Sequence, residues 1–424
     1  MVYIPVAESI FKNRSFGILW LGQLVSIFGD FVAIFAVISR ITFQLHGTPL
    51  DVSLVMVAYM LPLAVAGPVA GVLVDRWKVR RVMIVSDLTR AVLAALLVTA
   101  TDVRQISVVM ALLGLLSSFF GPAQSVALRV LVPPANLLAA NQALQQAFYV
   151  VRIFSPAVAG ALVTWMGENF CFWLDAASFV FSASMIARLV IERPATHLGS
   201  VEERALPATG GARTRGALEK LSHDFAEGNR FIFSHRALSF AFLAASAAMF
   251  MLSSFSPLIS IYIRDTLHAG KLLYGFISAM VGVGLIVGTA GVRRAAAGRP
   301  MSSVIVAGLF GLACGAALLG AFQWTGTAAL STLTIGAAIG FIVVPATTLS
   351  QKETPPAMQG RVSSTFMSLF SLAQVLGMLV SGVVAARIGI RPMFLACAAA
   401  TALLASASWV FLRPPRPAQP EPAA

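Results

Sequence analysis

Apolar residues occur along this chain in long runs, which clusters of charged residues, proline and glycine separate. Twelve runs can be marked, at 16–45, 51–74, 82–101, 104–128, 138–166, 170–190, 238–263, 272–291, 301–321, 325–349, 361–386 and 391–412. A helix needs about 20 apolar residues to cross a bilayer, so each run is long enough for one crossing. The pattern therefore predicts an all-α membrane protein with twelve transmembrane helices.

The composition agrees with this prediction. Of the 424 residues, 58% are hydrophobic and only 11% are charged, whereas a soluble domain carries about 25% charged residues. A water-soluble globule cannot hide so much apolar surface, which argues against a soluble enzyme. No zinc-protease, Walker or nucleophile-elbow motif is present, so we expect no enzyme, no cofactor and no metal site.

Lysine and arginine gather on one side of the predicted membrane. Basic residues cluster around Lys12, in the loop from Arg76 to Arg81, in the middle segment and near the C-terminus, while the opposite loops carry few. By the positive-inside rule both termini and the middle segment are cytoplasmic. The net charge of +13 then reflects topology rather than nucleic-acid binding, and we expect a multi-pass protein of the bacterial inner membrane.

One long polar segment, 191–236, divides the chain. Its first part is rich in proline and glycine, as in a flexible linker. From Ala217 to Phe233 apolar residues recur at helical spacing, which predicts an amphipathic helix at the membrane interface; a loosely ordered linker is the alternative. The predicted organisation is a six-helix bundle at 1–190, a cytoplasmic linker at 191–236 and a second six-helix bundle at 237–424.

The two parts repeat weakly. The pair Pro122-Ala123 precedes the triplet 133–135 (Pro-Pro-Ala), and Pro345-Ala346 precedes the same triplet at 355–357. Landmarks that recur with nearly constant separation, at matching places among the spans, indicate a duplicated unit. A parallel repeat requires an even number of spans per unit, which six plus six satisfies.

The loop between spans two and three carries the most specific motif, from Gly71 to Arg81 (GVLVDRWKVRR). It resembles the G-x-L-x-D-R-x-G-R-R motif of the major facilitator superfamily, with Lys78 where that family usually has glycine. Other segments resemble the branch of macrolide efflux proteins and enterobactin-type exporters, namely 22–30, 121–123, 174–179 and 360–361. The stretch 343–351 also resembles lysophospholipid transporters. The resemblance implies two six-helix bundles around a central site that opens alternately to each side.

The resemblance also assigns a conformational latch to the motif loop. It implies that Asp75 caps the N-terminus of a facing helix in the second bundle, where span eleven starts near Arg361, because an acid is favourable at that end of a helix dipole. The small Gly71 would let that helix approach, and Arg129 would pair with Asp75. The expected latch residues are Gly71, Asp75, Arg76, Arg80, Arg129 and Arg361. The plainer alternative is that these charges only set topology.

Span five contains the segment 151–160 (VRIFSPAVAG). It resembles a worn form of the antiporter motif G-x-x-x-G-P-x-x-G-G, in which Pro156 and Gly160 remain, Ser155 stays small and Val151 replaces the first glycine. Proline inside a helix removes a hydrogen bond and bends the helix. We expect Ser155, Pro156 and Gly160 to form a helix-packing surface, and the resemblance favours export by antiport.

Charged residues inside the spans are functional candidates because each is expensive to place in lipid. Asp30 and Arg152 lie at similar depth in spans one and five, which predicts an ion pair or a shared water-filled cavity. We expect Asp30, Arg152 and Asp175 to serve transport and proton coupling. A buried structural ion pair is the alternative for Asp30, and a structural role is preferred for Asp175. Asp87 and Arg90, three residues apart, are expected to satisfy each other.

These observations predict a secondary active transporter that exports a hydrophobic or amphiphilic small molecule in exchange for protons. A lysophospholipid flippase and a non-transporting membrane sensor or scaffold are the alternatives. The expected partners are a small-molecule substrate, protons and membrane lipids, with no nucleic acid, and we expect a monomer.

Overall fold

Almost every residue of the described parts of the chain is helical. The computed structural model describes residues 10–74, 76–191, 226–355 and 358–411. The long helices are α2 (Arg14–Ser39), α3 (Pro49–Val74), α4 (Val79–Leu96), α5 (Val103–Leu131), α6 (Leu137–Ala187), α8 (Arg236–Asp265), α9 (Lys271–Ala295), α10 (Met301–Ala321), α11 (Thr325–Glu353), α12 (Gln359–Ile388) and α13 (Ile390–Phe411). Short helical turns η1 (Arg40–Gln44), η2 (Leu97–Thr99) and η3 (Pro134–Asn136) extend three of them. The expected all-helical membrane fold is confirmed.

Eleven helices within the described residues are long and apolar enough to cross a membrane, and one of them is long enough to cross twice. The stretch Pro134–Ala187 has 54 residues, or about 80 Å of helix at 1.5 Å per residue. Gly167 interrupts it with a non-helical backbone at φ 82° and ψ 168°. At this φ a residue without a Cβ is favoured.

Contacts with α2 show that the chain reverses at Gly167. Before it, α6 runs beside α2 in the same direction, with Trp20 Nε1 donating to the carbonyl of Ala143 at 3.1 Å. After it, Ser39 Oγ donates to Glu168 at 2.9 Å, and Gly22 lies against Ser182. α6 therefore consists of two crossings, 137–166 and 168–187, and the arrangement accommodates the twelve expected spans.

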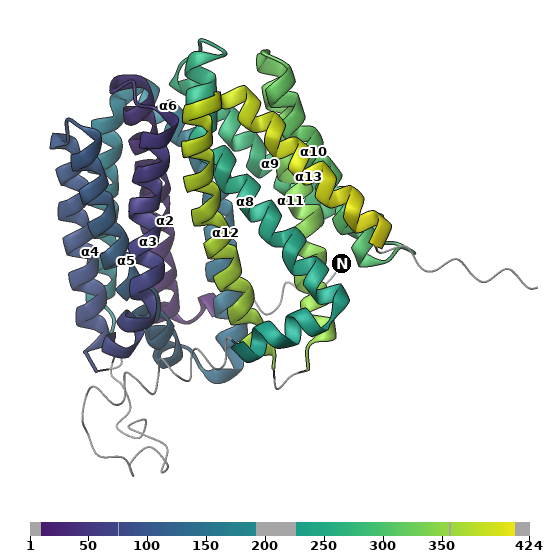
Figure 1. Cartoon of the computed structure of the whole chain (residues 1–424). Coiled ribbons are helices and arrows are strands. Elements are labelled where there is room, and N and C mark those ends of the chain that lie inside the picture. Colours follow the sequence, from purple (N-terminus) through teal and green to yellow (C-terminus); the bar gives the residue numbers. More distant parts are fainter. Residues whose placement is uncertain (1–9, 75, 192–225, 356–357, 412–424) are drawn as a thin grey trace, which may run out of the picture.

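The helices pack in two groups (Figure 1). In the first group α2 packs on α6, α3 on α5, and α4 on both α5 and α6. In the second group α8 packs on α12, α9 on α11, and α10 on α11 and α13. The first crossing of α6 meets α9, and α3 meets α12, so these two seams join the groups.

Glycine makes both seams close. A Cβ added to Gly160 would lie 2.7 Å from the Cα of Gly275, and one added to Gly282 would lie 2.8 Å from the side chain of Ile153. On the other seam, a Cβ on Gly382 would lie 2.5 Å from the Cβ of Ser53. Small residues permit such backbone approach, which is how membrane helices gain packing energy without a hydrophobic drive between them.

The two ends of the molecule differ. We call the end with the turns at 45–48, Gly167 and 266–270 the closed end, and the end with 76–78, 188–191 and 296–300 the basic end. Thr42 Oγ1 donates to Ser260 Oγ at 3.0 Å, and Arg264 Nη1 donates to the carbonyl of Thr42 at 2.6 Å. Every hydrogen bond and ion pair that joins described residues of the two groups lies at the closed end.

A short helical segment at 226–234 leads into α8. Ile232 is fully buried, Gly228 lies against Arg361 and Thr365 of α12, and Glu227 accepts from Arg361 at 2.8 Å. The described part of the predicted amphipathic helix thus packs on the second group. Residues 192–225, with the rest of that prediction and of the predicted linker, lie outside the described residues.

The closed end can be tested by cross-linking. In a variant carrying Thr42→Cys and Ser260→Cys, with Cys314 replaced by serine and a protease site inserted between 196 and 213, mild oxidation should join the two groups. Because the two native hydroxyl oxygens lie 3.0 Å apart, the two introduced sulfur atoms should meet and the disulfide should form readily. After cleavage the chain should run as one band on a non-reducing gel and as two bands with reductant. Each single cysteine variant is the control. Two bands without reductant would show that the closed end does not form.

Candidate functional site

Four charged side chains meet inside the first group. Asp30 comes from α2, Asp87 and Arg90 from α4, and Asp175 from the second crossing of α6. Arg90 Nη1 lies 3.9 Å from Asp30 Oδ2, and Arg90 Nη2 donates to Asp87 Oδ1. Asp175 interacts electrostatically with both Asp30 and Arg90. We call these four residues the carboxyl cluster.

The carboxyl cluster is removed from solvent. Asp87, Asp175 and Arg90 are 0%, 2% and 4% exposed, while the side chain of Asp30 retains 28% exposure. The guanidinium of Arg90 lies between two aromatic rings, 4.3 Å from the centre of Phe179 and 4.8 Å from that of Phe120. Cation–π contacts of this kind are stronger away from water, so they help to hold Arg90 in place.

Charge does not balance in the carboxyl cluster. Three carboxyl groups face one guanidinium, and burying an uncompensated charge costs several kcal/mol even after relaxation. The arrangement can take up and release protons, because a bound proton removes excess negative charge without moving any helix. Asp30, as the most exposed member, is the group that a proton from solvent would reach first.

Gly29 allows α2 to approach the cluster. A Cβ added to Gly29 would lie 2.6 Å from Asp175 Oδ1 and 2.8 Å from the Cβ of Ser178. Ser178 Oγ in turn donates to the carbonyl of Asp175 at 2.7 Å. Glycine at this position therefore sets the distance between Asp30 and Asp175.

The predicted Asp30–Arg152 pair does not form. Asp30 lies by Arg90, whereas Arg152 is exposed and has Tyr149 as its charge-interacting neighbour. Depth alone could not separate the two arginines, because both lie far from the ends of their helices. The (i, i+3) pair of Asp87 and Arg90 was predicted correctly, but its contact with Asp30 was missed.

Of the six expected latch residues, the five that the structure describes lie at the basic end. A Cβ on Gly71 would meet nothing within 4 Å, so no helix packs closely on it in this structure. Arg80 donates to the carbonyl of Ala187, Arg129 donates to the carbonyl of Ser125 at 3.3 Å, and Arg76 is exposed. Arg361 pairs with Glu227 of the same side of the molecule. Asp75 lies outside the described residues.

Two of the three expected packing residues of span five, Pro156 and Gly160, lie along the seam with α9. Ser155 is 1% exposed, the carbonyl of Pro156 faces Gly275, and Gly160 meets the backbone of Gly275.

Glu168 forms a second buried charge site, at the closed end. It is 1% exposed, and its carboxylate receives hydrogen bonds from Ser39 at 2.9 Å and Gln44 at 2.5 Å. Lys271 of the second group lies 2.6 Å away. The sequence analysis did not predict this ion pair. An acid and a lysine at two predicted outer turns, Glu168 and Lys271, could have indicated it.

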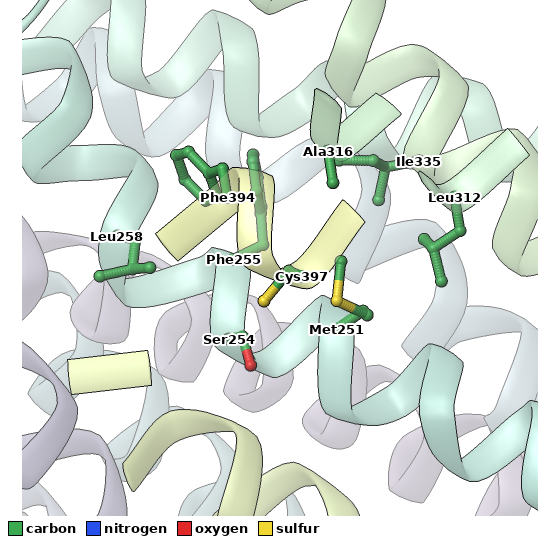
Figure 2. A pocket seen from close by; sticks show the side chains of 9 residues that line it. All are labelled: Met251, Ser254, Phe255, Leu258, Leu312, Ala316, Ile335, Phe394 and Cys397. Carbon is green, nitrogen blue, oxygen red and sulfur yellow. The ribbon is translucent and has the colours of Figure 1, made fainter. Parts of the chain in front are cut away.

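The described part of the second group has no comparable charge site. Among the described residues, every buried charged side chain belongs to the first group, and the buried polar residues of the second group are serines and threonines. A cavity inside the second group is lined almost wholly by apolar side chains of α8, α10, α11 and α13 (Figure 2). Its one hydroxyl, on Ser254, donates to the carbonyls of Phe250 and Gly377 at 2.8 and 3.0 Å. This cavity therefore offers packing space rather than chemistry.

Comparison with known proteins agrees with this architecture. A family model described as Major Facilitator Superfamily matches residues 19–377. An uncharacterized MFS-type transporter, YfiS of Bacillus subtilis, is 29% identical over 402 residues, with 92% of this chain and 91% of that protein covered. Macrolide efflux protein A of Streptococcus pyogenes is 26% identical, covering 89% and 91%. The multidrug efflux pump Tap of Mycolicibacterium fortuitum is 28% identical, covering 83% and 85%.

Solved structures show the same fold. The nucleoside transporter NupG superimposes with a TM-score of 0.70 at 13% identity, over 94% of this chain and all of that one. A bacterial homolog of the human lysosomal transporter Spinster, in an inward-facing and unoccupied conformation, gives 0.69 at 13% identity, over 98% of this chain and all of that one.

Gly29→Ala should destabilise the first group. The added methyl would clash with Ser178 and Asp175, and overpacking of this kind costs about 1–3 kcal/mol. We expect a lower melting temperature for the protein purified in a neutral detergent. Gly17→Ala, on the same helix with nothing within 4 Å, is the matched control and should keep or slightly raise it. Equal melting of the two variants would contradict the packing described here.

Lys271→Met should weaken the closed end. The change leaves Glu168 buried without its cation, and a hydrogen bond to a charged group contributes about 1.5–3 kcal/mol. The rate of disulfide cross-linking between positions 42 and 260 in the double-cysteine variant should therefore fall about tenfold or more, while Lys352→Met at the basic end should leave it unchanged. An undiminished rate would show that the ion pair does not hold the groups together.

Proposed function

The chain belongs to the Major Facilitator Superfamily, and on that premise we propose that it exports hydrophobic or amphiphilic small molecules in exchange for protons. The observation that carries this proposal is the carboxyl cluster, in which three acids share one arginine inside the membrane-spanning part of the protein. The names of two relatives, a macrolide efflux protein and a multidrug efflux pump, support export as the direction.

Protons would act through the contact between α2 and α4. With Asp30 ionised, Arg90 attracts it, and this ion pair links α2 to α4. With Asp30 protonated, that attraction is lost while Arg90 keeps Asp87. The proton therefore changes how strongly one helix is tied to the rest of the first group, which is the differential interaction that a conformational shift requires.

The closed end indicates which state the structure represents. The positive-inside distribution of lysine and arginine places the basic end in the cytoplasm. The inter-group contacts of Thr42, Arg264 and Lys271 then close the outer side. We therefore assign an inward-facing state, with 1–190 and 237–424 as the two moving bundles and 191–236 as the link between them, in a bacterial inner membrane with both termini cytoplasmic.

In the outward-facing state the latch would assemble as the closed end separates. The start of α12 at Arg361 would then be approached by Gly71, Arg76, Arg80 and Arg129, and Asp75 would lie at the N-terminus of that helix. Alternating access of this kind requires that contacts at one end form as those at the other break.

Asp30→Asn should abolish proton-driven export while leaving the protein folded. The amide keeps the size of the side chain but can neither bind a proton nor attract Arg90 as a carboxylate does. A panel of drugs, siderophores and lysophospholipids, tested in cells with and without a protonophore, first identifies an exported compound. Uphill export of that compound is then measured in proteoliposomes with an imposed pH gradient.

Asp102→Asn is the matched control, because Asp102 caps α5 at the exposed closed end and asparagine is also a good N-cap residue. It should export at the wild-type rate. If Asp30→Asn retains full uphill export, Asp30 is not the coupling group. If no compound of the panel depends on the proton gradient, the proposed coupling itself is wrong.

A further inference from the structure

Arg152 occupies an unusual place in the first crossing of α6. It lies about 15 residues from Leu137 and from Gly167, or roughly 22 Å from either end of that crossing. Val150 and Phe154, each two residues away, are 52% and 58% exposed, and residues two apart on a helix lie about 200° apart. Together with exposed Trp165 they mark the lipid-facing side, so Arg152 is on the opposite, inward side.

The neighbours of Arg152 confirm its direction. Ser155, about 60° away around the helix, is buried. The carbonyl of Pro156, on the other flank, faces Gly275 of α9, and Ile153 packs against Gly282 of α9. Arg152 therefore points between the first group and α9. It is nevertheless exposed, so packed side chains do not cover it.

Arg152 has no counter-charge in the part of the chain that the structure describes. Among those residues, no carboxylate lies within ion-pair distance of it, and no hydrogen bond to it is formed. Asp30, the nearest candidate by depth, is already held by Arg90. A guanidinium at mid-membrane depth with no partner is costly, and a site with such a group favours an anion.

Aromatic rings of the first group lie beside this position, and a further ring pair lies nearer the closed end, at the seam with α9. Tyr149, one turn before Arg152, is 52% exposed and packs edge-on against Phe148 at 5.8 Å. Phe148 meets Phe31 of α2 at 5.7 Å. Phe35 of α2 stacks on Tyr274 of α9 at 4.3 Å. The inward side of α6 thus combines the guanidinium of Arg152 with apolar rings.

We propose that Arg152 binds the anionic group of the transported molecule, and that the substrate is an anionic amphiphile with an apolar body. This inference rests on the proposed function, since it names the substrate class of the same passage. Arginine suits the role because its planar fork of donors fits a carboxylate or phosphate in two-point contact. The aromatic rings of Phe31, Phe148 and Tyr149 would contact the apolar body, and a cationic drug would be repelled.

Equilibrium binding tests the proposal without any gradient. The full-length chain in dodecyl maltoside is titrated with cholate, with cholate methyl ester, with lysophosphatidylglycerol and with ethidium, and binding is followed by tryptophan fluorescence. We expect cholate or lysophosphatidylglycerol to bind at least tenfold more tightly than the uncharged ester and than ethidium. Tighter binding of cholate would indicate a free solute as the source of the anionic group, and tighter binding of lysophosphatidylglycerol would indicate a lipid.

Arg152→Gln should lower the affinity for the preferred anion at least tenfold and leave the ester unchanged, while Arg152→Lys, which keeps the charge but loses the two-point contact, should bind with intermediate affinity. Arg104→Gln, which changes an exposed arginine at the closed end, is the control and should bind as wild type. Equal affinity of wild type and Arg152→Gln for the anion overturns the proposal. Should Arg152→Gln fail to fold, the comparison of anion and ester on the wild-type chain decides, and equal affinities overturn it.

Because binding is measured at equilibrium, its outcome is separate from proton coupling. If the wild-type chain binds the anions no more tightly than the ester but still exports in response to the proton gradient, only the proposed substrate class is rejected. Anion binding that depends on Arg152, without gradient-driven export, would reject the proposed coupling alone.

Discussion

A charged side chain in a membrane-spanning helix must find its counter-charge, hydrogen bonds or water within the protein, because lipid supplies none. This constraint explains where the charges of the chain lie. Asp30, Asp87 and Asp175 share Arg90, and Glu168 is satisfied by Ser39, Gln44 and Lys271. Arg152 is the exception among the deep charges that the structure describes, and its inward direction makes water or a bound anion its source of compensation.

The two charge sites of the first group are linked by a single continuous helix. α2 carries Asp30 at its middle, and its extension η1 carries Thr42, which contacts Ser260 and Arg264 of the second group. Under the proposed proton coupling, this helix would carry the effect of protonation from the Asp30–Arg90 pair at its middle to the inter-group contacts at its end. This coupling requires that the Asp30–Arg90 pair and the inter-group contacts of Thr42 change in the same transition. It then depends on two positions of one helix and needs no chain of intermediate residues.

The described interior of the second group holds no buried charged side chain. Its buried polar residues, within the described ranges, are serines and threonines, and its seams depend on glycines such as Gly275 and Gly382, which let backbones approach. Small residues at a seam allow two helices to slide or separate without breaking strong pairs. Among the described residues, the buried charged side chains therefore lie in the first group, and the interior of the second group is packed by apolar and small polar side chains.

Much of the fold follows from local pattern alone. Runs of apolar residues predicted the spans, and the depth of Asp30 and Arg152 marked them as unusual, because hydropathy and depth are properties of one helix read along its own length. The sequence could not choose between Arg90 and Arg152 as the partner of Asp30, since both lie deep in their helices. That choice depends on the rotation of each helix about its axis and on the close approach of α2 to α6 at Gly29. The Glu168–Lys271 pair likewise joins turns that are far apart in sequence. Only the packing of helices from separate parts of the chain brings such groups within a few ångströms, and the tertiary structure alone decides it.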